Sequence, residues 1–425
     1  MEKRTFVLKG DICFSPDSGT LSMTKGGYAV CAEGVCQGVF EALPEQYRDL
    51  PVHDCGDCLV IPGLVDLHVH APQFAFRGTG MDLELLDWLN QVAFPEEAKY
   101  QDLEYARRAY AIFAAALRRS ATTRACIFGT LHRPATELLM DLMEENGLVT
   151  MVGKVNMDRN SPDILTEAGA AESAEETVRW LEETGGKYKY VTPILTPRFI
   201  PSCTDELMGR LKEIQNQYHL PVQSHMSENL SEIAWVQELC PESEFYGDAY
   251  DRFGLFGGDE KTVMAHCVYS DERECQRMKE RGVFVAHCPE SNMNLASGIA
   301  PVRRFLDMGL KAGLGSDVAG GSSESIFRAM AQAIQVSKLR WRLADESLKP
   351  LTVEEAFYMG TKGGGEFFGK VGSFEPGYEF DAVVLRDSSL AHPQPVTMKQ
   401  RLERIIYLGD DRHVAEKYVG GRKIL

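Results

Sequence analysis

Helix-like and strand-like patterns alternate along the middle of the chain. Amphipathic segments such as 102–121 and 204–218 carry apolar residues at helical spacing, and short runs that are apolar on both faces lie between such segments. These runs predict strands at residues 149–156, 190–199, 221–228, 262–269, 283–292 and 311–317. Repetition of strand, helix and strand predicts a parallel sheet covered by helices. A closed (β/α)₈ barrel of the TIM type is the simplest α/β fold of this kind.

Both ends of the chain are strand-rich and have few helical patterns. The strand-like runs lie at residues 5–14, 27–40, 380–387, 404–410 and 417–425, the last with a Gly-Gly hairpin turn. Neither end is long enough to bury a stable hydrophobic core by itself. We therefore predict a barrel over residues 65–371 and one small β-sandwich domain built jointly from residues 1–64 and 372–425.

Composition excludes several classes of partner. The chain has 425 residues and a formal net charge of −17, and it has no concentrated Lys/Arg run that could form a patch for nucleic acid. The N-terminal segment turns polar before a signal sequence could form, and no later segment is long and apolar enough to span a bilayer. Eleven scattered cysteines indicate reduced thiols. We expect a cytoplasmic protein without nucleic-acid or membrane partners.

A His-x-His pair ends the apolar run at residues 61–67. Because alternate residues of a strand point to the same face, His68 and His70 leave the backbone together, while Val69 points the other way. Two imidazoles on one side form a pair of metal ligands. The pattern is short, and a lone strand histidine is more often a core or surface residue, so the remaining ligands must come from elsewhere.

Polar residues end strand after strand in the predicted barrel. They are His68 and His70, Arg198, His225 with Glu228, His266, His287 with Asn292, and Asp317. Catalytic groups of parallel barrels gather at the C-terminal ends of the strands. One such residue means little, but their recurrence predicts a shared site. We interpret His287 as a structural hydrogen-bond partner.

Four of these residues form a plausible ligand set for one metal ion. The imidazoles of His68, His70 and His225 and the carboxylate of Asp317 suit zinc or iron(II) and leave room for a water molecule. His266 is either a further ligand or a neighbour of the ligands.

Two further features bear on the chemistry of the metal. No lysine ends the middle strands, where a carbamylated side chain could bridge two ions, and this favours one ion per chain. Glu228, three residues after His225, is placed as a general acid or base near the metal.

Several motifs resemble the amidohydrolase superfamily, in its branch of deaminases and chlorohydrolases with one metal ion. They are PGLVDLHVH, PVQSHMSE, VMAHC, VAHCPESNMNLASG and GLGSDVAGG. Longer motifs resemble the guanine deaminase family: HVHAPQFAFRGTGMDLELLDWL, TPRFIPSC, SHMSEN and YLGDDRHVAEKYVGG. The resemblance extends from the first strands to the C-terminal hairpin. Glu290 and Ser316 replace residues that are more common at these positions, but neither carries the expected chemistry.

The resemblance implies a role for each site residue. The ligands of a single Zn²⁺, or of Fe²⁺ in its place, would be His68, His70, His225 and Asp317. Glu228 would be the proton shuttle for attack by zinc-bound hydroxide, His266 would hydrogen-bond the metal-bound water, and Asp317 could assist a second proton transfer.

The resemblance also implies the substrate, which would be guanine, and a homodimer. Gln73 and the Arg198–Phe199 pair would hold the purine. The substrate site would also include His70, His225, Glu228 and Asp317. Deamination of guanine would yield xanthine and ammonia.

Two alternatives stay open. The first is a related hydrolase that deaminates or dechlorinates another heterocycle, such as a triazine or an adenosine-like nucleoside. Arg198 separates these substrates, because its donor fork suits the carbonyl oxygen of guanine and not the amino group of adenine. The second alternative is a non-catalytic metal-binding scaffold on the same fold.

Overall fold

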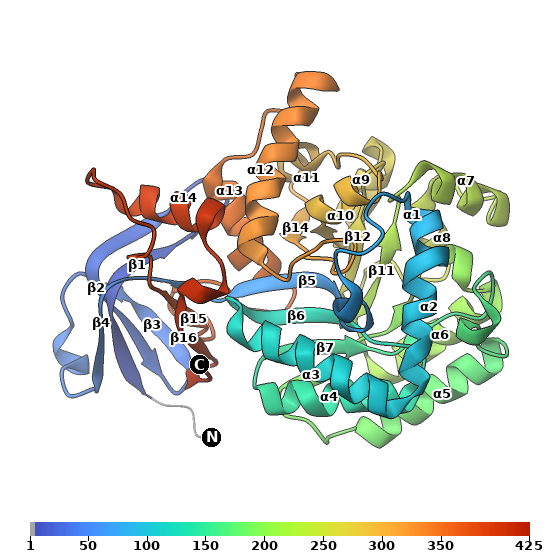
Figure 1. Ribbon diagram of the computed structural model, residues 1–425, viewed down its shortest axis with the longest axis horizontal. Helices are drawn as coiled ribbons and strands as arrows, with labels where there is room; N and C mark the ends of the chain where they lie inside the picture. Colours follow the sequence, from blue (N-terminus) through green and yellow to red (C-terminus); the bar gives the residue numbers. More distant parts are fainter. Residues whose placement is uncertain (1–4) are drawn as a thin grey trace.

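The computed structural model describes residues 5–425. Within these residues, eight parallel strands form two four-stranded sheets that meet to close a barrel. The strands are β5 (Leu64–His70), β6 (Thr122–Phe128), β7 (Val149–Gly153), β9 (Val191–Pro193), β11 (Val222–Met226), β12 (Thr262–His266), β13 (Phe284–His287) and β14 (Lys311–Leu314) (Figure 1). At one junction Leu195 N donates to Pro221 O at 2.9 Å, and at the other Asp317 N donates to His68 O at 2.8 Å. The predicted barrel is confirmed.

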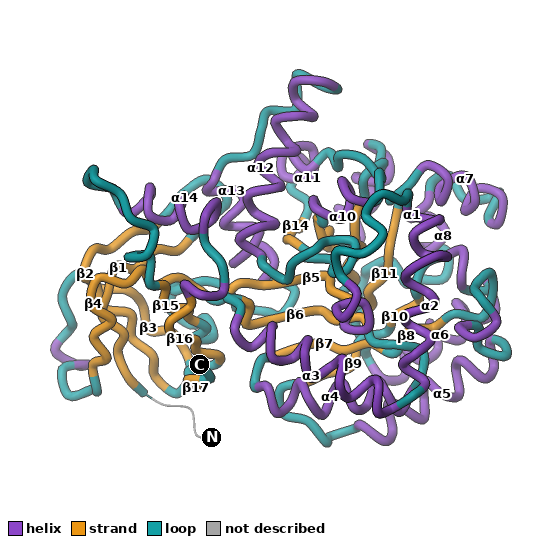
Figure 2. Tube along the Cα trace, viewed as in Figure 1, coloured by secondary structure: helices purple, strands orange, loops and turns teal. Residues whose placement is uncertain are grey.

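Helices connect the strands and cover the barrel, as Figure 2 shows. The longer ones are α3 (Leu103–Arg119), α4 (Arg133–Asn146), α5 (Ala170–Thr184), α6 (Asp205–Tyr218), α7 (Leu230–Leu239), α9 (Glu272–Arg281) and α12 (Ile326–Leu343). The shorter ones are α1 (Leu85–Trp88), α2 (Phe94–Glu97), α8 (Tyr246–Asp251), α10 (Pro289–Asn294), α11 (Val302–Met308) and α13 (Val353–Tyr358). α6 begins where the Thr204 side chain accepts from Leu207 N. No helix between residues 5 and 425 combines the length and apolar character needed to cross a membrane.

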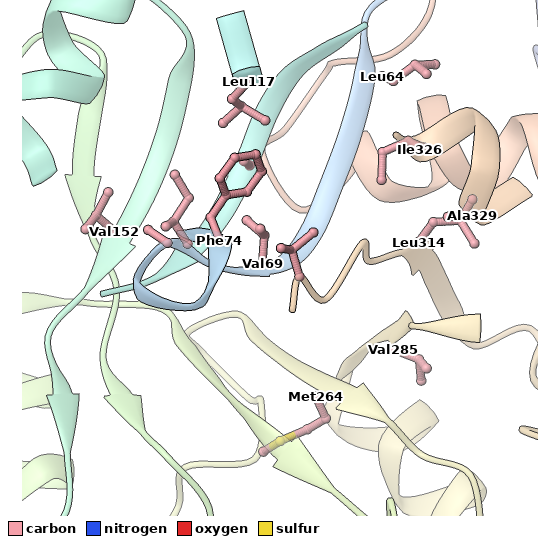
Figure 3. Packing of buried hydrophobic residues seen from close by; sticks show 14 of the residues in the cluster. Leu64, Val69, Phe74, Leu117, Val152, Met264, Val285, Leu314, Ile326 and Ala329 are labelled. Atoms are coloured by element: carbon pink, nitrogen blue, oxygen red, sulfur yellow. The ribbon is translucent and has the colours of Figure 1, made fainter. Parts of the chain in front are cut away.

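A continuous apolar core lies between the strands and the helices. Figure 3 shows Val69 of β5 and Leu314 of β14 in this core, together with Leu117 of α3 and Ile326 of α12. The helical side chains follow the spacing of an amphipathic helix, so each helix buries one apolar face. This packing holds the strand ends, and therefore the side chains that extend from them, in fixed positions.

Both ends of the chain contribute to one seven-stranded sheet, in the order β17-β16-β15-β4-β1-β2-β3. Its strands are β1 (Phe6–Phe14), β2 (Ser22–Ala32), β3 (Val35–Phe40), β4 (Val52–Pro62), β15 (Ala382–Leu385), β16 (Val414–Val419) and β17 (Arg422–Lys423). The Gly-Gly turn between β16 and β17 is confirmed, since Val419 pairs with Arg422. A sandwich is not confirmed, because these strands form a single sheet.

The strand predicted at residues 404–410 is wrong. This segment belongs to α14 (Met398–Leu408), which begins with a capping box between Thr397 and Gln400. Leu402, Ile405 and Ile406 are its buried residues. Their spacing of three and four residues is helical, and burial of this face outweighs the strand preference of the two isoleucines.

A buried ion pair joins the barrel to the terminal sheet. Arg124 of β6 donates from Nε to Asp381 Oδ2 at 2.6 Å and from a terminal nitrogen to Asp381 Oδ1 at 2.9 Å. Gly420 N, in the C-terminal hairpin, donates to the same carboxylate at 2.8 Å. Three segments far apart in the sequence therefore meet at Asp381.

Candidate active site

The four predicted metal ligands come together at the C-terminal ends of the barrel strands. His70 Nε2 lies 3.2 Å from His68 Nε2 and 3.2 Å from His225 Nε2. Asp317 Oδ1 lies 3.1 Å from His68 Nε2 and 3.4 Å from His70 Nε2. His68 and His70 lie on the same side of β5, as the alternation predicts. Three nitrogens and one oxygen therefore face a common point.

The geometry and charge of this cluster fit one metal ion. Two nitrogens bound to a tetrahedral zinc at about 2.0–2.1 Å lie roughly 3.3 Å apart, close to the observed separations. Burial lowers the pKa of His70 and of His225 well below the ordinary value, so these imidazoles are neutral and offer lone pairs. Burial opposes ionisation of Asp317, but the neighbouring imidazoles, His68 foremost, bring its pKa below the ordinary range. Such a donor set suits zinc or iron(II).

Backbone contacts orient two of the histidines. His225 Nδ1 lies 2.5 Å from the Arg198 carbonyl oxygen. Because a carbonyl only accepts, His225 carries its proton on Nδ1, which leaves Nε2 free for a metal. The buried carboxylate of Asp66 accepts from His68 N at 3.1 Å and from Ser316 N at 3.0 Å. It thereby ties β5 to the loop that carries Asp317. Asp66 was not among the predicted site residues, although its place two residues before His68 was a signal.

Glu228 and His266 lie next to the ligand cluster. Glu228 Oε2 is 3.4 Å from His266 Nε2, and Ser297 Oγ donates to Glu228 Oε1 at 2.9 Å. Burial raises the pKa of Glu228 to about 7, which suits a group that must take up and release a proton near neutral pH. His266 Nδ1 lies 2.8 Å from Asn292 Oδ1, so Asn292 fixes the orientation of the imidazole. His266 Nε2 lies 3.7 Å from Asp317 Oδ2, beside the ligands.

The backbone is strained at two of these residues. His266 has a φ of 74° and Asp317 has a φ of 46°, in the left-handed region that residues with a Cβ seldom adopt. Such strain is frequent at functional sites, where the surrounding structure fixes the conformation. His266 is the last residue of β12 and Asp317 lies three residues after β14, so the strained backbone directs their side chains toward the cluster.

A pocket open to solvent lies over the cluster. The predicted substrate residues Gln73, Arg198 and Phe199 line it together with Glu228. Trp88, which the sequence analysis did not identify, also lines it. The pocket therefore joins polar and aromatic side chains to the end of the barrel that carries the predicted metal ligands.

A lysine does end one barrel strand, contrary to prediction. Lys154 follows β7 directly and is buried. Its Nζ lies 2.6 Å from Glu167 Oε1 and 3.3 Å from the Val155 carbonyl oxygen. Its ammonium is therefore held in an ion pair with Glu167, which is not one of the predicted ligands.

The prediction for His287 is wrong. Neither of its ring nitrogens has a hydrogen-bond partner among residues 5–425. Burial lowers its pKa to about 3, so the ring is a neutral group in the core. The strand-end position alone could not separate His287 from the ligands.

The chain matches the model of the Amidohydrolase family over residues 59–424. It is 39% identical to the guanine deaminase of Dictyostelium discoideum over 88% of this chain and 84% of that protein. It is 35% identical to the guanine deaminase of Escherichia coli (strain K12) over 90% of this chain and 86% of that protein. A crystal structure of guanine deaminase from C. acetobutylicum, with guanine bound in its active site, matches with a TM-score of 0.96 and 45% identity, over 99% of this chain and 100% of that one. This chain therefore belongs to the amidohydrolase family and, within it, to the guanine deaminases.

Proposed function

We propose that this protein hydrolyses guanine to xanthine and ammonia. The observation that carries the proposal is the pocket, which joins Arg198, Gln73 and Phe199 to Glu228 and to the cluster of nitrogen and oxygen ligands. The guanine bound in the related C. acetobutylicum enzyme supports the choice of substrate.

We assign the metal site to a single Zn²⁺, with Fe²⁺ as the alternative. Its ligands are His68, His70, His225 and Asp317. Bound zinc would supply a water molecule whose pKa is lowered from 15.7 to about 7. The neutral histidines and the ionised Asp317 suit this task, because both offer lone pairs at neutral pH.

Glu228 acts as the proton shuttle in this proposal. It accepts a proton from the attacking water and delivers it to guanine N3 while the new bond from oxygen to C2 forms. Asp317 assists transfer of a second proton to the exocyclic amine, the C2–N bond breaks and ammonia leaves. His266 holds the attacking water through a hydrogen bond. A carboxyl group with a pKa of about 7 can both accept and release the proton.

The polar wall selects guanine. Arg198 donates to O6, Gln73 completes the polar edge, and Phe199 lies against the ring as an apolar wall. Adenine has no amine at C2, so it must place its C6 amine at the metal to be deaminated, and it has no carbonyl oxygen to accept from Arg198. An unpaired buried donor strongly disfavours the wrong ligand.

The alternatives have less support. Triazine hydrolases share the fold at 16–18% identity, which shows the architecture alone. A non-catalytic scaffold would not require a buried carboxylate 3.4 Å from an imidazole at the metal site. The homodimer and the single metal ion stay predictions.

The test is a panel of substrates with the purified, zinc-loaded protein. Guanine, adenine, cytosine and an aminated triazine are each assayed for release of ammonia. The proposal expects rapid release from guanine and slow or no release from the others. A preference for any other member of the panel would overturn it.

A further inference from the structure

The carboxylate of Glu97 connects the two polar residues of the substrate wall. It lies at the end of α2, is buried, and is not among the residues that line the pocket. Glu97 Oε1 accepts from Gln73 Nε2 at 2.7 Å and from one terminal nitrogen of Arg198 at 3.0 Å. Glu97 Oε2 accepts from the other terminal nitrogen at 2.5 Å. The bidentate pair fixes the plane of the guanidinium.

The same short helix contacts Arg198 a second time. The ring of Phe94, one turn before Glu97, lies with its centroid 4.9 Å from the Arg198 guanidinium carbon. Arg198 therefore has an aromatic face on one side and a carboxylate in its own plane. Neither contact comes from the barrel strands, so α2 determines where this side chain lies.

Glu97 also determines which groups of Gln73 donate and which accept. Gln73 Oε1 accepts from Ala319 N at 3.1 Å, while its Nε2 donates to Glu97. A flipped amide would set oxygen against carboxylate and NH₂ against N–H, so this orientation is the favourable one. Gln73 Oε1 already accepts from Ala319 N, so the polar hydrogens that remain on Gln73 Nε2 and on the Arg198 guanidinium make this wall predominantly one of N–H donors. Such a wall matches an edge of a heterocycle that carries acceptors.

We propose that Glu97 is a positioning residue that holds Arg198 and Gln73 as a wall of N–H donors for the oxygen-bearing edge of the substrate. The proposal rests on guanine as the substrate. Glu97 touches neither the substrate nor the ligand cluster, so its effect on turnover passes through Arg198 and Gln73.

The variant Glu97→Gln tests this role with little change in volume. The amide offers one acceptor atom where the carboxylate offers two, so the bidentate pair with Arg198 is lost. We expect kcat/KM for guanine to fall about 10- to 100-fold, the range for loss of a hydrogen bond to a charged group. Metal content should stay close to that of the parent protein. The thermal unfolding midpoint is expected to fall, because buried Arg198 loses its charged partner, so the kinetics are measured at a temperature at which the variant is folded.

2-Aminopurine separates positioning from general damage. It carries the same 2-amino group as guanine and lacks the 6-oxygen. If Glu97 acts through Arg198 on that oxygen, Glu97→Gln should change kcat/KM for 2-aminopurine less than about 3-fold. Where turnover of 2-aminopurine is too slow to follow, its inhibition constant is measured instead, and the same limit applies. Glu96→Gln is the matched control, since Glu96 is the adjacent residue and contacts Lys99 and Tyr105 instead. Glu96→Gln should leave kcat/KM unchanged for both guanine and 2-aminopurine.

The double variant Glu97→Gln/Arg198→Ala completes the test. If Glu97 acts through Arg198, the double variant should process guanine within about 3-fold of Arg198→Ala alone. Equal losses on guanine and 2-aminopurine, or full additivity in the double variant, would overturn the proposal. A parent protein that does not deaminate guanine would instead refute the proposed function.

Discussion

Glu228 Oε2 lies 3.4 Å from His266 Nε2, at the edge of the cluster formed by the predicted metal ligands. The two groups influence each other. Burial disfavours a charged His266, but the carboxylates of Glu228 and Asp317 raise its pKa above the ordinary value. Glu228 and His266 can therefore share a proton, as the proposed acid–base chemistry requires.

Replacement of Glu228 by glutamine should stop turnover while the metal stays bound. The amide keeps the shape of the side chain but cannot carry a proton. We expect kcat to fall about 10²- to 10⁴-fold, the range typical for a general acid or base. Steady-state kinetics and metal analysis of the same preparation measure both effects. Turnover within a few-fold of the parent would show that Glu228 is not the shuttle.

The pH dependence of kcat/KM should report the raised pKa of Glu228. A base must be ionised to accept a proton, and burial moves the pKa of Glu228 from 4.5 to about 7. Activity on guanine should therefore decrease as the pH falls below about 7, by up to tenfold per pH unit. An acidic limb near pH 4.5 would contradict this assignment. The residual activity of Glu228→Gln should lack the limb.

One metal ion should bind per chain. His70 Nε2 lies 3.2 Å from two other imidazole nitrogens, so these ligand atoms surround one position. Elemental analysis of the purified protein should give one equivalent of zinc or iron, and a chelator that removes it should abolish turnover. His225→Ala should bind metal less tightly. Two tightly bound equivalents per chain would exclude the single-ion site.

Arg198→Ala should weaken the preference for guanine and leave the metal in place. The Arg198 side chain is not a ligand, and its loss removes a charged donor worth roughly 1.5–3 kcal/mol. We expect the ratio of kcat/KM for guanine to that for adenine to fall about 10- to 100-fold. An unchanged ratio of the two kcat/KM values would show that a group other than Arg198 recognises O6.

Arg124→Ala should destabilise the fold without affecting the site directly. The Arg124 and Asp381 side chains are 3% and 0% exposed, so the variant leaves a buried carboxylate without its partner. Such a loss costs about 3–5 kcal/mol. Denaturant unfolding measures it, with Arg210→Ala as the control, because Arg210 and its partner Glu206 are 43% and 64% exposed. Equal losses of unfolding free energy in the two variants would show that the buried pair does not stabilise the contact between the barrel and the terminal sheet.

Local patterns predicted the barrel and the residues that its strands present. Strand alternation placed His68 and His70 on one face, and the rule that parallel strand ends share a face brought His225 and Asp317 to them. These inferences succeed because they depend only on short-range geometry and on chain direction. The same rule included His287, which the core buries without a hydrogen-bond partner among the described residues.

Residues fixed by long-range packing could not be predicted in this way. Glu96 and Glu97 are adjacent in a polar segment, yet only Glu97 is buried against Arg198. Nothing in the local sequence separates the two. The pairing of the terminal strands into one sheet likewise depends on contacts between distant segments, so the predicted sandwich had no local support. The domain boundaries after residues 64 and 371 stay predictions.

The most direct test of the account is kcat/KM for guanine and for adenine, measured with the zinc-loaded parent protein by following xanthine and hypoxanthine. The donors on Arg198 and Gln73 match O6 of guanine, whereas adenine has no carbonyl oxygen to accept from them and must place its C6 amine at the metal. The account predicts conversion of guanine to xanthine with a preference of several orders of magnitude, about 10³-fold or more. Comparable values for the two purines, or faster deamination of adenine, would contradict it.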